Sequence, residues 1–190
     1  MNKVYPELSV VIPFFNEEES IQKVCEELRQ VLSNEAGLSW EVIMVDDGSN
    51  DNTPKLMDDI VIRYKGFRAL HLVPNSGQSA ALEAGFNAAC GEFIATLDGD
   101  GQNDPGDIPG LLNIINNDGV DMVCGIRQKR SDNLVRRLSS WIANCVRSAI
   151  LEDHVTDVGC SMRVFRRHCM KRIKFFKNAH RFFPALFLMN

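Results

Sequence analysis

Residues 93–105 read Phe-Ile-Ala-Thr-Leu-Asp-Gly-Asp-Gly-Gln-Asn-Asp-Pro, an apolar run that stops at two closely spaced carboxylates. The apolar run is short and bounded by turn residues, so it predicts a buried strand. Asp98 and Asp100 stand one residue apart at its carboxyl end, and the glycine between them permits tight backbone geometry. This oxygen-rich corner suits a hard divalent cation, to which Gln102 and Asp104 could add ligands. A plain polar turn is the alternative, since Asp and Gly favour turns by themselves.

Similar apolar runs recur along the chain and alternate with segments whose apolar residues have helical spacing. The predicted strands span residues 8–13, 40–45, 67–73, 93–97 and 121–125. The predicted helices span residues 21–32, a segment capped by Asp51 and Thr53, residues 79–89 and residues 109–117. Strands joined by helical crossovers predict an α/β fold, in which a mainly parallel sheet carries helices on both faces. In such folds, ligands bind beyond the carboxyl ends of the strands.

The length and composition indicate one globular domain. The chain has 190 residues, of which 45% are hydrophobic and 24% are charged, both ordinary values. No apolar stretch reaches the length of a membrane-spanning helix and no signal-peptide pattern opens the chain, so we expect a soluble, cytoplasmic domain. None of the six cysteines belongs to a Cys-x-x-Cys pair. We therefore expect reduced cysteines rather than a zinc cluster or a disulfide framework.

The charges are distributed unevenly along the chain. Residues 1–126 hold seven basic and 21 acidic side chains, a net charge of −14, whereas residues 127–190 hold 14 basic and four acidic side chains, a net charge of +10. The asymmetry predicts an acidic, metal-binding part followed by a basic part that meets an anion, whether a phosphate, a nucleic acid or a lipid surface. Solvated, Arg-rich helix faces are the alternative.

Polar residues follow each of the five predicted strands. Turn propensity alone does not explain why they recur at all five strand ends. They are Asn16 and Glu17, Asp46 and Asp47, Asn75 to Gly77, Asp98 to Gln102, and Arg127. Asp47 could accept hydrogen bonds from a nucleobase while Asp46 braces the turn. The turn that ends at Gly77 precedes a helix, where free amides favour a phosphate, unless the turn is only a cap. Arg127 offers a planar fork to a phosphate.

The basic segment after residue 126 bears on the choice of acceptor. Residues 128–133 lack an apolar period and predict a loop, whereas the apolar stripe within residues 134–150 predicts an amphipathic helix. Arg136 lies off the stripe. Because a basic amphipathic helix can rest on an anionic membrane surface, Arg127 and Arg136 are candidates for binding an acceptor phosphate. A helix packed on the sheet explains the stripe at least as well.

These motifs together resemble those of family 2 glycosyltransferases, which have the Rossmann-like GT-A fold. The motifs are Pro13-Phe14-Phe15-Asn16-Glu17, the turn Val45-Asp46-Asp47-Gly48-Ser49 with Asp51 and Thr53, Asn75-x-Gly77, and Leu97-Asp98-Gly99-Asp100-Gly101-Gln102. The later stretches 157–163 (Asp-Val-Gly-Cys-Ser-Met-Arg) and 180–182 (His-Arg-Phe) resemble the branch that glycosylates polyprenyl phosphates. This branch comprises dolichyl- and undecaprenyl-phosphate mannosyl- and glucosyltransferases. The resemblance covers nearly the whole chain, residues 1–190.

The resemblance implies a UDP- or GDP-linked sugar as the donor. It implies that donor-binding residues are Pro13, Phe15, Asn16, Glu17, Asp47, Gly77, Asp98, Gly99 and Asp100, with Asp47 touching the base. It further implies that Asp98, Asp100 and Gln102 gather around Mg²⁺ or Mn²⁺, which neutralises the departing diphosphate. Transfer would invert the anomeric carbon through in-line attack opposite the diphosphate.

The resemblance also implies a polyprenyl phosphate acceptor and peripheral contact with the inner face of the cell membrane, without a nucleic-acid partner. A lipid phosphate is already anionic, whereas a hydroxyl acceptor needs a general base. Asp157 is the candidate catalytic residue in that case; its alternative role is to brace Arg163 or a loop. Relatives of this branch usually continue beyond the segment that begins at His180, so the chain resembles a truncated member of the family.

Several other classes of protein are alternatives to a glycosyltransferase of this branch. A dehydrogenase would carry Gly-x-Gly-x-x-Gly after the first strand, where Pro13-Phe14-Phe15-Asn16 stands, and a phosphorelay receiver would carry its acidic pair there. If the chain is an enzyme, the alternative reaction is transfer to a hydroxyl of a surface polysaccharide. If it is not an enzyme, the alternative is a non-catalytic domain that binds nucleotide sugars. The sequence leaves the donor base, the sugar and the oligomeric state open.

Overall fold

The structure is a computed structural model that describes residues 5–126, 160–173, 176 and 178–188. The strands are β1 (Leu8–Phe14), β2 (Trp40–Asp46), β3 (Phe67–His71), β4 (Phe93–Thr96), β5 (Met122–Cys124) and β6 (Arg163–Arg166). The helices are α1 (Ile21–Asn34), α2 (Thr53–Arg63), α3 (Gln78–Ala88), α4 (Asp107–Asp118), the 3-10 helices η1 (Arg167–Arg172) and η2 (Ala179–Phe182), and α6 (Phe183–Leu188). Every strand and helix that the sequence predicts before residue 126 is present. The predicted helix within residues 134–150 lies outside the described residues.

The strands form one sheet in the order β3-β2-β1-β4-β6-β5. β1 pairs in parallel with β2 and β4, and β2 pairs in parallel with β3, which confirms the predicted parallel core. β6 lies antiparallel between β4 and β5, and the sequence analysis did not predict it. Its sequence, Arg-Val-Phe-Arg, has only two apolar residues between charged ends. Such a short run carries no clear strand period, so its pairing depends on the strands on either side.

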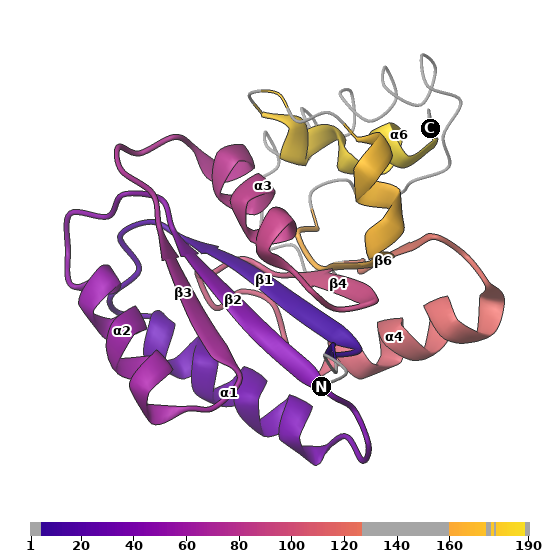
Figure 1. The fold of residues 1–190 in the computed structure, drawn as a ribbon, viewed down its shortest axis with the longest axis horizontal. Coiled ribbons are helices and arrows are strands. Elements are labelled where there is room, and N and C mark those ends of the chain that lie inside the picture. Colours follow the sequence, from indigo (N-terminus) through magenta and orange to yellow (C-terminus); the bar gives the residue numbers. More distant parts are fainter. Residues whose placement is uncertain (1–4, 127–159, 174–175, 177, 189–190) are drawn as a thin grey trace, which may run out of the picture.

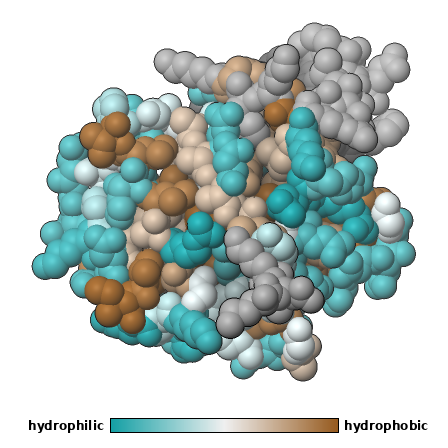
Figure 2. Space-filling view, viewed as in Figure 1, coloured by the Kyte–Doolittle hydropathy of each residue, from teal (hydrophilic) through white to brown (hydrophobic). Residues whose placement is uncertain are grey.

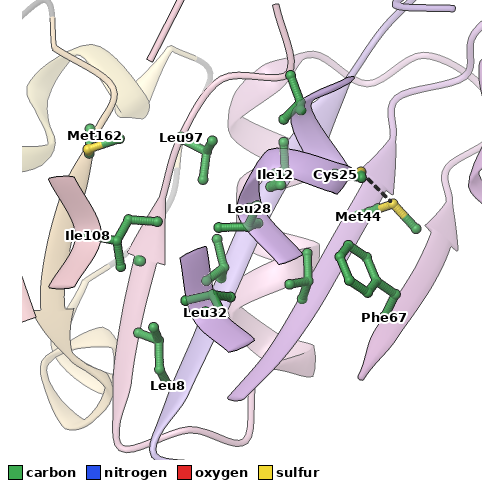
Figure 3. Packing of buried hydrophobic residues seen from close by; sticks show 14 of the residues in the cluster. Leu8, Ile12, Cys25, Leu28, Leu32, Met44, Phe67, Leu97, Ile108 and Met162 are labelled. Atoms are coloured by element: carbon green, nitrogen blue, oxygen red, sulfur yellow. Dashed lines mark hydrogen bonds between the residues drawn. The ribbon is translucent and has the colours of Figure 1, made fainter. Parts of the chain in front are cut away.

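Helices cover both faces of the sheet (Figure 1), as the sequence predicts. On one face, α1, α2 and α4 pack against alternate residues of β1 and β2, such as Val10 and Val42. On the other face, α3 and α6 pack against the intervening residues, such as Val11 and Ile43. Figure 3 shows the first of these cores, where Leu28 and Leu32 of α1 lie close to strand side chains. This two-sided burial explains why the central strands β1, β2 and β4 consist mainly of apolar residues.

The core also contains a thiol whose environment can be specified. Cys25 of α1 is fully buried, and its Sγ lies 3.6 Å from Sδ of Met44 (Figure 3). Burial raises the pKa of Cys25 to about 12, because the thiolate would lose its hydration. Since the thiolate is the reactive form, Cys25 is a chemically inert packing residue.

Hydrophilic and hydrophobic residues are interspersed on the face of the molecule in Figure 2. Hydrophobic side chains reach the surface over α2, a helix in which Ile62 is 85% exposed. Single exposed apolar residues of this kind are common on folded proteins. Within the described residues, every helix is too short or too polar to traverse a bilayer.

The strand registers bring three loops to one edge of the sheet. Phe14 at the end of β1 pairs with Asp46 at the end of β2, while Thr96 at the end of β4 pairs with Val11. The segments that follow these strands therefore emerge side by side. The start of α2 is fixed in the same region, because the Thr53 N–H donates a 2.9 Å hydrogen bond to Oδ1 of Asp51. Asp51 therefore satisfies an N–H group at the start of the helix, as predicted. Thr53, the other predicted cap, is instead the first residue of the helix, and Asn52 occupies the N-cap position.

Near its amino end, on the side of the sheet away from these loops, β2 carries a buried carboxylate, Glu41. Its Oε1 accepts hydrogen bonds from Ser9 Oγ at 2.7 Å and from the Cys90 N–H at 2.8 Å, and its Oε2 accepts one from Arg68 at 2.8 Å. Burial acts to raise the pKa of Glu41, but the hydrogen bonds outweigh burial and lower the pKa overall. The ionised form of Glu41 therefore stabilises the folded state.

We expect Glu41→Gln to lower the free energy of unfolding by about 2 kcal/mol near neutral pH, because it weakens hydrogen bonds to a charged, buried acceptor. The folded-state pKa of Glu41 lies below that of the unfolded chain. Its stabilisation is therefore complete above the unfolded pKa, about 4.3, and is lost as the pH falls through the folded pKa. Urea unfolding of both proteins, near neutral and at acidic pH, measures the effect.

The matched control is Glu92→Gln, because Glu92 is an exposed carboxylate 3.6 Å from Arg166. An exposed pair of this kind contributes at most about 1 kcal/mol. The difference between wild type and Glu41→Gln should shrink at acidic pH. A difference of the same size at both pH values would contradict the assignment of the stabilisation to the ionised carboxylate.

Candidate functional site

A cleft of about 470 Å³ opens at the edge of the sheet where β1, β2 and β4 end. Its lining comes from four loops and comprises Pro13, Phe14, Phe15, Glu17, Asp47, Asn75, Gly77, Gln78, Asp98, Gly99 and Asp100. Eight of the nine donor-binding residues expected from the sequence are among them, all but Asn16. Asp47 and Asp100, which are far apart in the sequence, thus face one shared cavity.

Asp47 fixes one wall of the cleft and is itself buried. Its Oδ1 accepts hydrogen bonds from the N–H groups of Ser76 at 2.8 Å and Gly77 at 3.0 Å. The side-chain amide of Asn75 donates to the backbone carbonyl of Asp47 at 2.7 Å and lies 3.2 Å from Oδ2. The amides of Ser76 and Gly77 are therefore engaged by a carboxylate of the protein. The amides of Ser76 and Gly77 are thus not free as expected, which favours the alternative role as a cap, and Gly77 is the N-cap residue of α3.

Asn16 lies outside the cleft lining and stabilises the turns beside Asp47. Its backbone is left-handed, with φ of 56°. Its N–H donates to Ser49 Oγ at 2.9 Å, and its Oδ1 accepts from the Asn50 N–H at 2.8 Å. The Glu17 N–H donates to Thr53 Oγ1 at 2.8 Å. These bonds join the turn after β1 to the turn after β2. The expected bracing by Asp46 is present, since its Oδ1 accepts from the Ser49 N–H at 2.9 Å.

Asp98 and Asp100 form a carboxylate corner on the other side of the cleft. Asp98 Oδ1 accepts a 2.9 Å hydrogen bond from the side chain of Gln78, and Asp100 Oδ1 accepts a 3.0 Å hydrogen bond from the Gln102 N–H. Within the described part of the chain, the second oxygen of each carboxylate makes no hydrogen bond. Two partly available carboxylates that are solvent-accessible and one residue apart fit a hard divalent cation.

Gln102, the third ligand expected from the sequence, is placed differently. It is exposed, it lies outside the cleft lining, and it contacts Asp100 through its backbone N–H rather than its side chain. The loop is instead held by Asn103, whose Oδ1 accepts from the Asp98 N–H at 3.1 Å and from Ser161 Oγ at 2.9 Å. Asp98 and Asp100 thus both line the cleft, and Gln102 adjoins them through its backbone contact with Asp100.

Two residues that the sequence analysis missed complete the corner. Gln78 is the first residue of α3, and its amide orients Asp98. Ser20 precedes α1, and its Oγ lies 2.7 Å from the Gly99 carbonyl oxygen and 2.8 Å from Oε2 of Glu17. Both are polar residues at the start of a helix that follows a strand. That position was the available signal, although neither residue was given a role from the sequence.

A buried positive charge lies close to the corner. Arg163 of β6 pairs with Thr96 of β4, and its guanidinium lies 5.7 Å from the centre of the Phe183 ring. Burial lowers the pKa of Arg163, while the nearby Cys124, Cys160 and Asp98 act in the opposite direction. Arg163 thus contributes a fixed cationic field beside Asp98.

Three expected site residues, Asp157, Arg127 and Arg136, lie outside the described residues. The side chains of His180 and Arg181 also lie outside the described part of the structure. The acceptor side of the site therefore stays a prediction from the sequence.

Comparison with known proteins identifies related sequences. A family model, glycosyl transferase family 2, matches residues 9–174. A dodecaprenyl-phosphate galacturonate synthase of Rhizobium johnstonii is 39% identical over 181 residues, covering 94% of this chain and 53% of that protein. An undecaprenyl-phosphate 4-deoxy-4-formamido-L-arabinose transferase of Pectobacterium atrosepticum is 37% identical over 180 residues, covering 94% of this chain and 54% of that protein. The chain thus spans about half the length of the curated relatives it matches.

A solved structure supplies a comparison of the fold. Glucosyl-3-phosphoglycerate synthase from Mycobacterium tuberculosis, in complex with Mn²⁺, UDP and glucosyl-3-phosphoglycerate, superposes with a TM-score of 0.73. The two chains are 20% identical, and the match covers 97% of this chain and 67% of that one. At this level of identity the likeness concerns the fold alone.

Proposed function

The chain belongs to glycosyl transferase family 2 and has its GT-A fold, and from this membership we propose that it transfers a sugar from a nucleotide-diphosphate sugar to a polyprenyl phosphate. The observation that carries the proposal is the shared cleft, in which Asp47, Asp98 and Asp100 from two separate loops line one cavity. The names of both curated relatives specify polyprenyl-phosphate acceptors and support the same acceptor class here.

The donor occupies the cleft in this proposal. Pro13, Phe15, Glu17 and Asp47 bound the nucleoside end, and Gly77 and Gly99 allow close approach of the donor to the backbone. Asp98 and Asp100 would hold Mg²⁺ or Mn²⁺, with Gln102 as a further ligand, and this cation would neutralise charge on the departing diphosphate. The structural neighbour was solved with Mn²⁺ and UDP, which supports a divalent cation and a nucleotide as the molecules bound here. Gln78 keeps Asp98 oriented, and the Asp47 hydrogen bonds keep the opposite wall in place.

We assign residues 1–126 to donor binding and residues 127–190 to the acceptor, because the two parts carry net charges of −14 and +10. Arg127 and Arg136 are the proposed ligands of the lipid phosphate, which needs no base to become a nucleophile. Asp157 is the proposed general base for a hydroxyl acceptor. A polyprenyl phosphate lies in a membrane, so the proposed location is peripheral, at the cytoplasmic face.

The testing experiment measures donor binding and transfer separately. Thermal unfolding is followed with UDP- and GDP-linked sugars in the presence of Mn²⁺ and then with excess chelator. One nucleotide should raise the melting temperature in a metal-dependent manner, because ligands of the folded state stabilise it by mass action. The same donor, radiolabelled, is incubated with a short polyprenyl phosphate or with an oligosaccharide.

Label in the polyprenyl phosphate is the expected result. Label in the oligosaccharide alone would contradict the polyprenyl phosphate as acceptor and would indicate a sugar hydroxyl instead. Metal-dependent binding without transfer to either acceptor would favour a non-catalytic binding domain. The absence of a melting shift with every nucleotide would remove the basis of the proposal.

A further inference from the structure

A second group of potential metal ligands lies away from the cleft, where β5 begins and β6 ends. Asp121 immediately precedes β5, and His168 and Cys169 belong to η1, which follows β6. The antiparallel pairing of β5 with β6 and a 3.0 Å hydrogen bond from the Arg166 N–H to the Asp121 carbonyl oxygen bring these two segments together. One ligand atom from each of the three side chains lies within 4.8 Å of the other two.

The geometry distinguishes between two uses of this trio. Nε2 of His168 lies 3.5 Å from Cys169 Sγ and 3.8 Å from Asp121 Oδ1. A thiol–imidazole–carboxylate relay needs the thiol at one ring nitrogen and the carboxylate at the other. Here both groups approach the same nitrogen, which can hold only one proton. The arrangement is therefore wrong for proton relay, whereas convergence of all three groups on one point suits a shared cation.

The distances and the ligand types favour a particular cation. Tetrahedral Zn²⁺, with bonds of about 2.3 Å to sulfur and about 2.0–2.1 Å to nitrogen, requires a sulfur–nitrogen separation of about 3.5 Å. The separation in the structure is 3.5 Å. The corresponding oxygen–nitrogen separation is about 3.4 Å, compared with 3.8 Å in the structure. The Asp121 side chain is 62% exposed, so it has room for this small movement.

We propose that Asp121, His168 and Cys169 bind a borderline-soft divalent cation of the Zn²⁺ class. Thiolate and imidazole select such ions, whereas the carboxylate corner at Asp98 and Asp100 suits harder ions such as Mg²⁺ and Mn²⁺. Water can supply the fourth ligand, because the His168 and Asp121 side chains are 61% and 62% exposed. His168 also lines a cavity of about 570 Å³ at the amino ends of the strands. The ion would join the start of β5 to η1 and so secure the outer edge of the sheet.

The sequence predicts no zinc cluster, and the spacing of the three residues explains why this site is not apparent from the sequence. The ligands are a lone Asp and an adjacent His-Cys pair more than 40 residues later. This spacing matches none of the usual paired-ligand patterns. Only the pairing of β5 with β6, which the sequence did not predict, brings them together.

The experiment titrates the metal-free chain with Co²⁺, which substitutes for Zn²⁺ and absorbs in the near ultraviolet when a thiolate binds it. The expected result is a saturable thiolate-to-cobalt band that Zn²⁺ abolishes by displacement. Cys169→Ser should remove the band. Two control variants should retain the band. Cys90→Ser alters a thiol beside the cavity that His168 lines, and Asp98→Asn alters the proposed cation site in the cleft. A band that persists in Cys169→Ser, or no band in the wild type, would overturn the proposal.

A measurement on the wild-type chain covers the case in which Cys169→Ser does not fold. Alkylation of each cysteine by iodoacetamide is followed by peptide mass spectrometry with and without Zn²⁺. Zn²⁺ should slow labelling of Cys169 at least about tenfold, because a metal-bound thiolate is a poor nucleophile, and should leave Cys90 unchanged. Equal labelling of Cys169 in both conditions would also reject the site. Neither result depends on sugar transfer, so failure here is separable from failure of the proposed function.

Discussion

Replacing Asp100 by Asn should slow sugar transfer about 100- to 1,000-fold, a loss of about 3–4 kcal/mol of transition-state stabilisation. Asp100 is exposed and lines the cleft beside Asp98. Asn keeps the shape of the side chain and an oxygen for the Gln102 N–H, but it lacks the charge that a divalent cation requires. The measurement is the initial rate of transfer over a range of Mn²⁺ concentrations, together with urea unfolding.

The matched control is Asp107→Asn. Asp107 is an exposed carboxylate in the first turn of α4, outside the cleft lining, so the substitution removes the same charge from a nearby segment. Its rate should stay within about twofold of wild type, because the lost interaction with the helix dipole concerns stability and is below about 1 kcal/mol. A wild-type rate for Asp100→Asn at every Mn²⁺ concentration would exclude the carboxylate corner as the cation site.

Gly99→Ala should destabilise the fold by about 2–3 kcal/mol and weaken donor binding, because there is no space for a methyl group between the two carboxylates. A Cβ at this position would lie 2.4 Å from Cδ1 of Phe14 and 2.9 Å from the Pro13 carbonyl oxygen. Phe14 is itself fully packed, so neither neighbour can move without shifting β1. Urea unfolding measures the first effect, and nucleotide titration with Mn²⁺ measures the second.

Gly110→Ala provides the contrast, since it makes the same chemical change within α4, where a Cβ meets no atom within 4 Å. The helix propensity of Ala should stabilise this variant by up to about 1 kcal/mol. The two substitutions are thus expected to have opposite signs. A neutral Gly99→Ala would mean that the loop after β4 relaxes freely, which would weaken the case for a rigid cation site.

The sequence predicted the elements whose burial leaves a regular pattern. The helical spacing of apolar residues identified α1: Ile21, Val24, Leu28 and Leu32 are buried, and Val31 is half-buried. Continuous apolar runs identified β1, β2 and β4 because both faces of these strands are covered. β6 was missed because Val164 and Phe165 are buried on opposite faces between two arginines, which gives neither an alternating nor a continuous run. Its position depends on pairing with β4 and β5.

The site was predictable to the extent that it follows from topology. Parallel strands end at one edge, so the carboxylates after β2 and β4 were expected to meet, and they share a cleft. Hydrogen bonds between distant segments were not predictable, such as Ser20 to Gly99, which are 79 residues apart. The family resemblance implied Asn16 as a donor-binding residue, but a motif does not reveal the left-handed turn that directs its side chain to the Asn50 N–H.

The place of β6 in the sheet has a consequence for the order in which the chain acquires its structure during synthesis on the ribosome. Among the described strands, β5 pairs with β6 alone, and β6 follows it by almost 40 residues. β2, β3 and β4 can each join the sheet as soon as they emerge, since each pairs with a strand made earlier. β5 has to wait, and the outer edge of β4 stays open until residues 163–166 arrive. A nascent chain stalled before that point would leave the backbone groups of β4 on that side without β6 as their partner, the kind of unpaired strand edge that promotes aggregation.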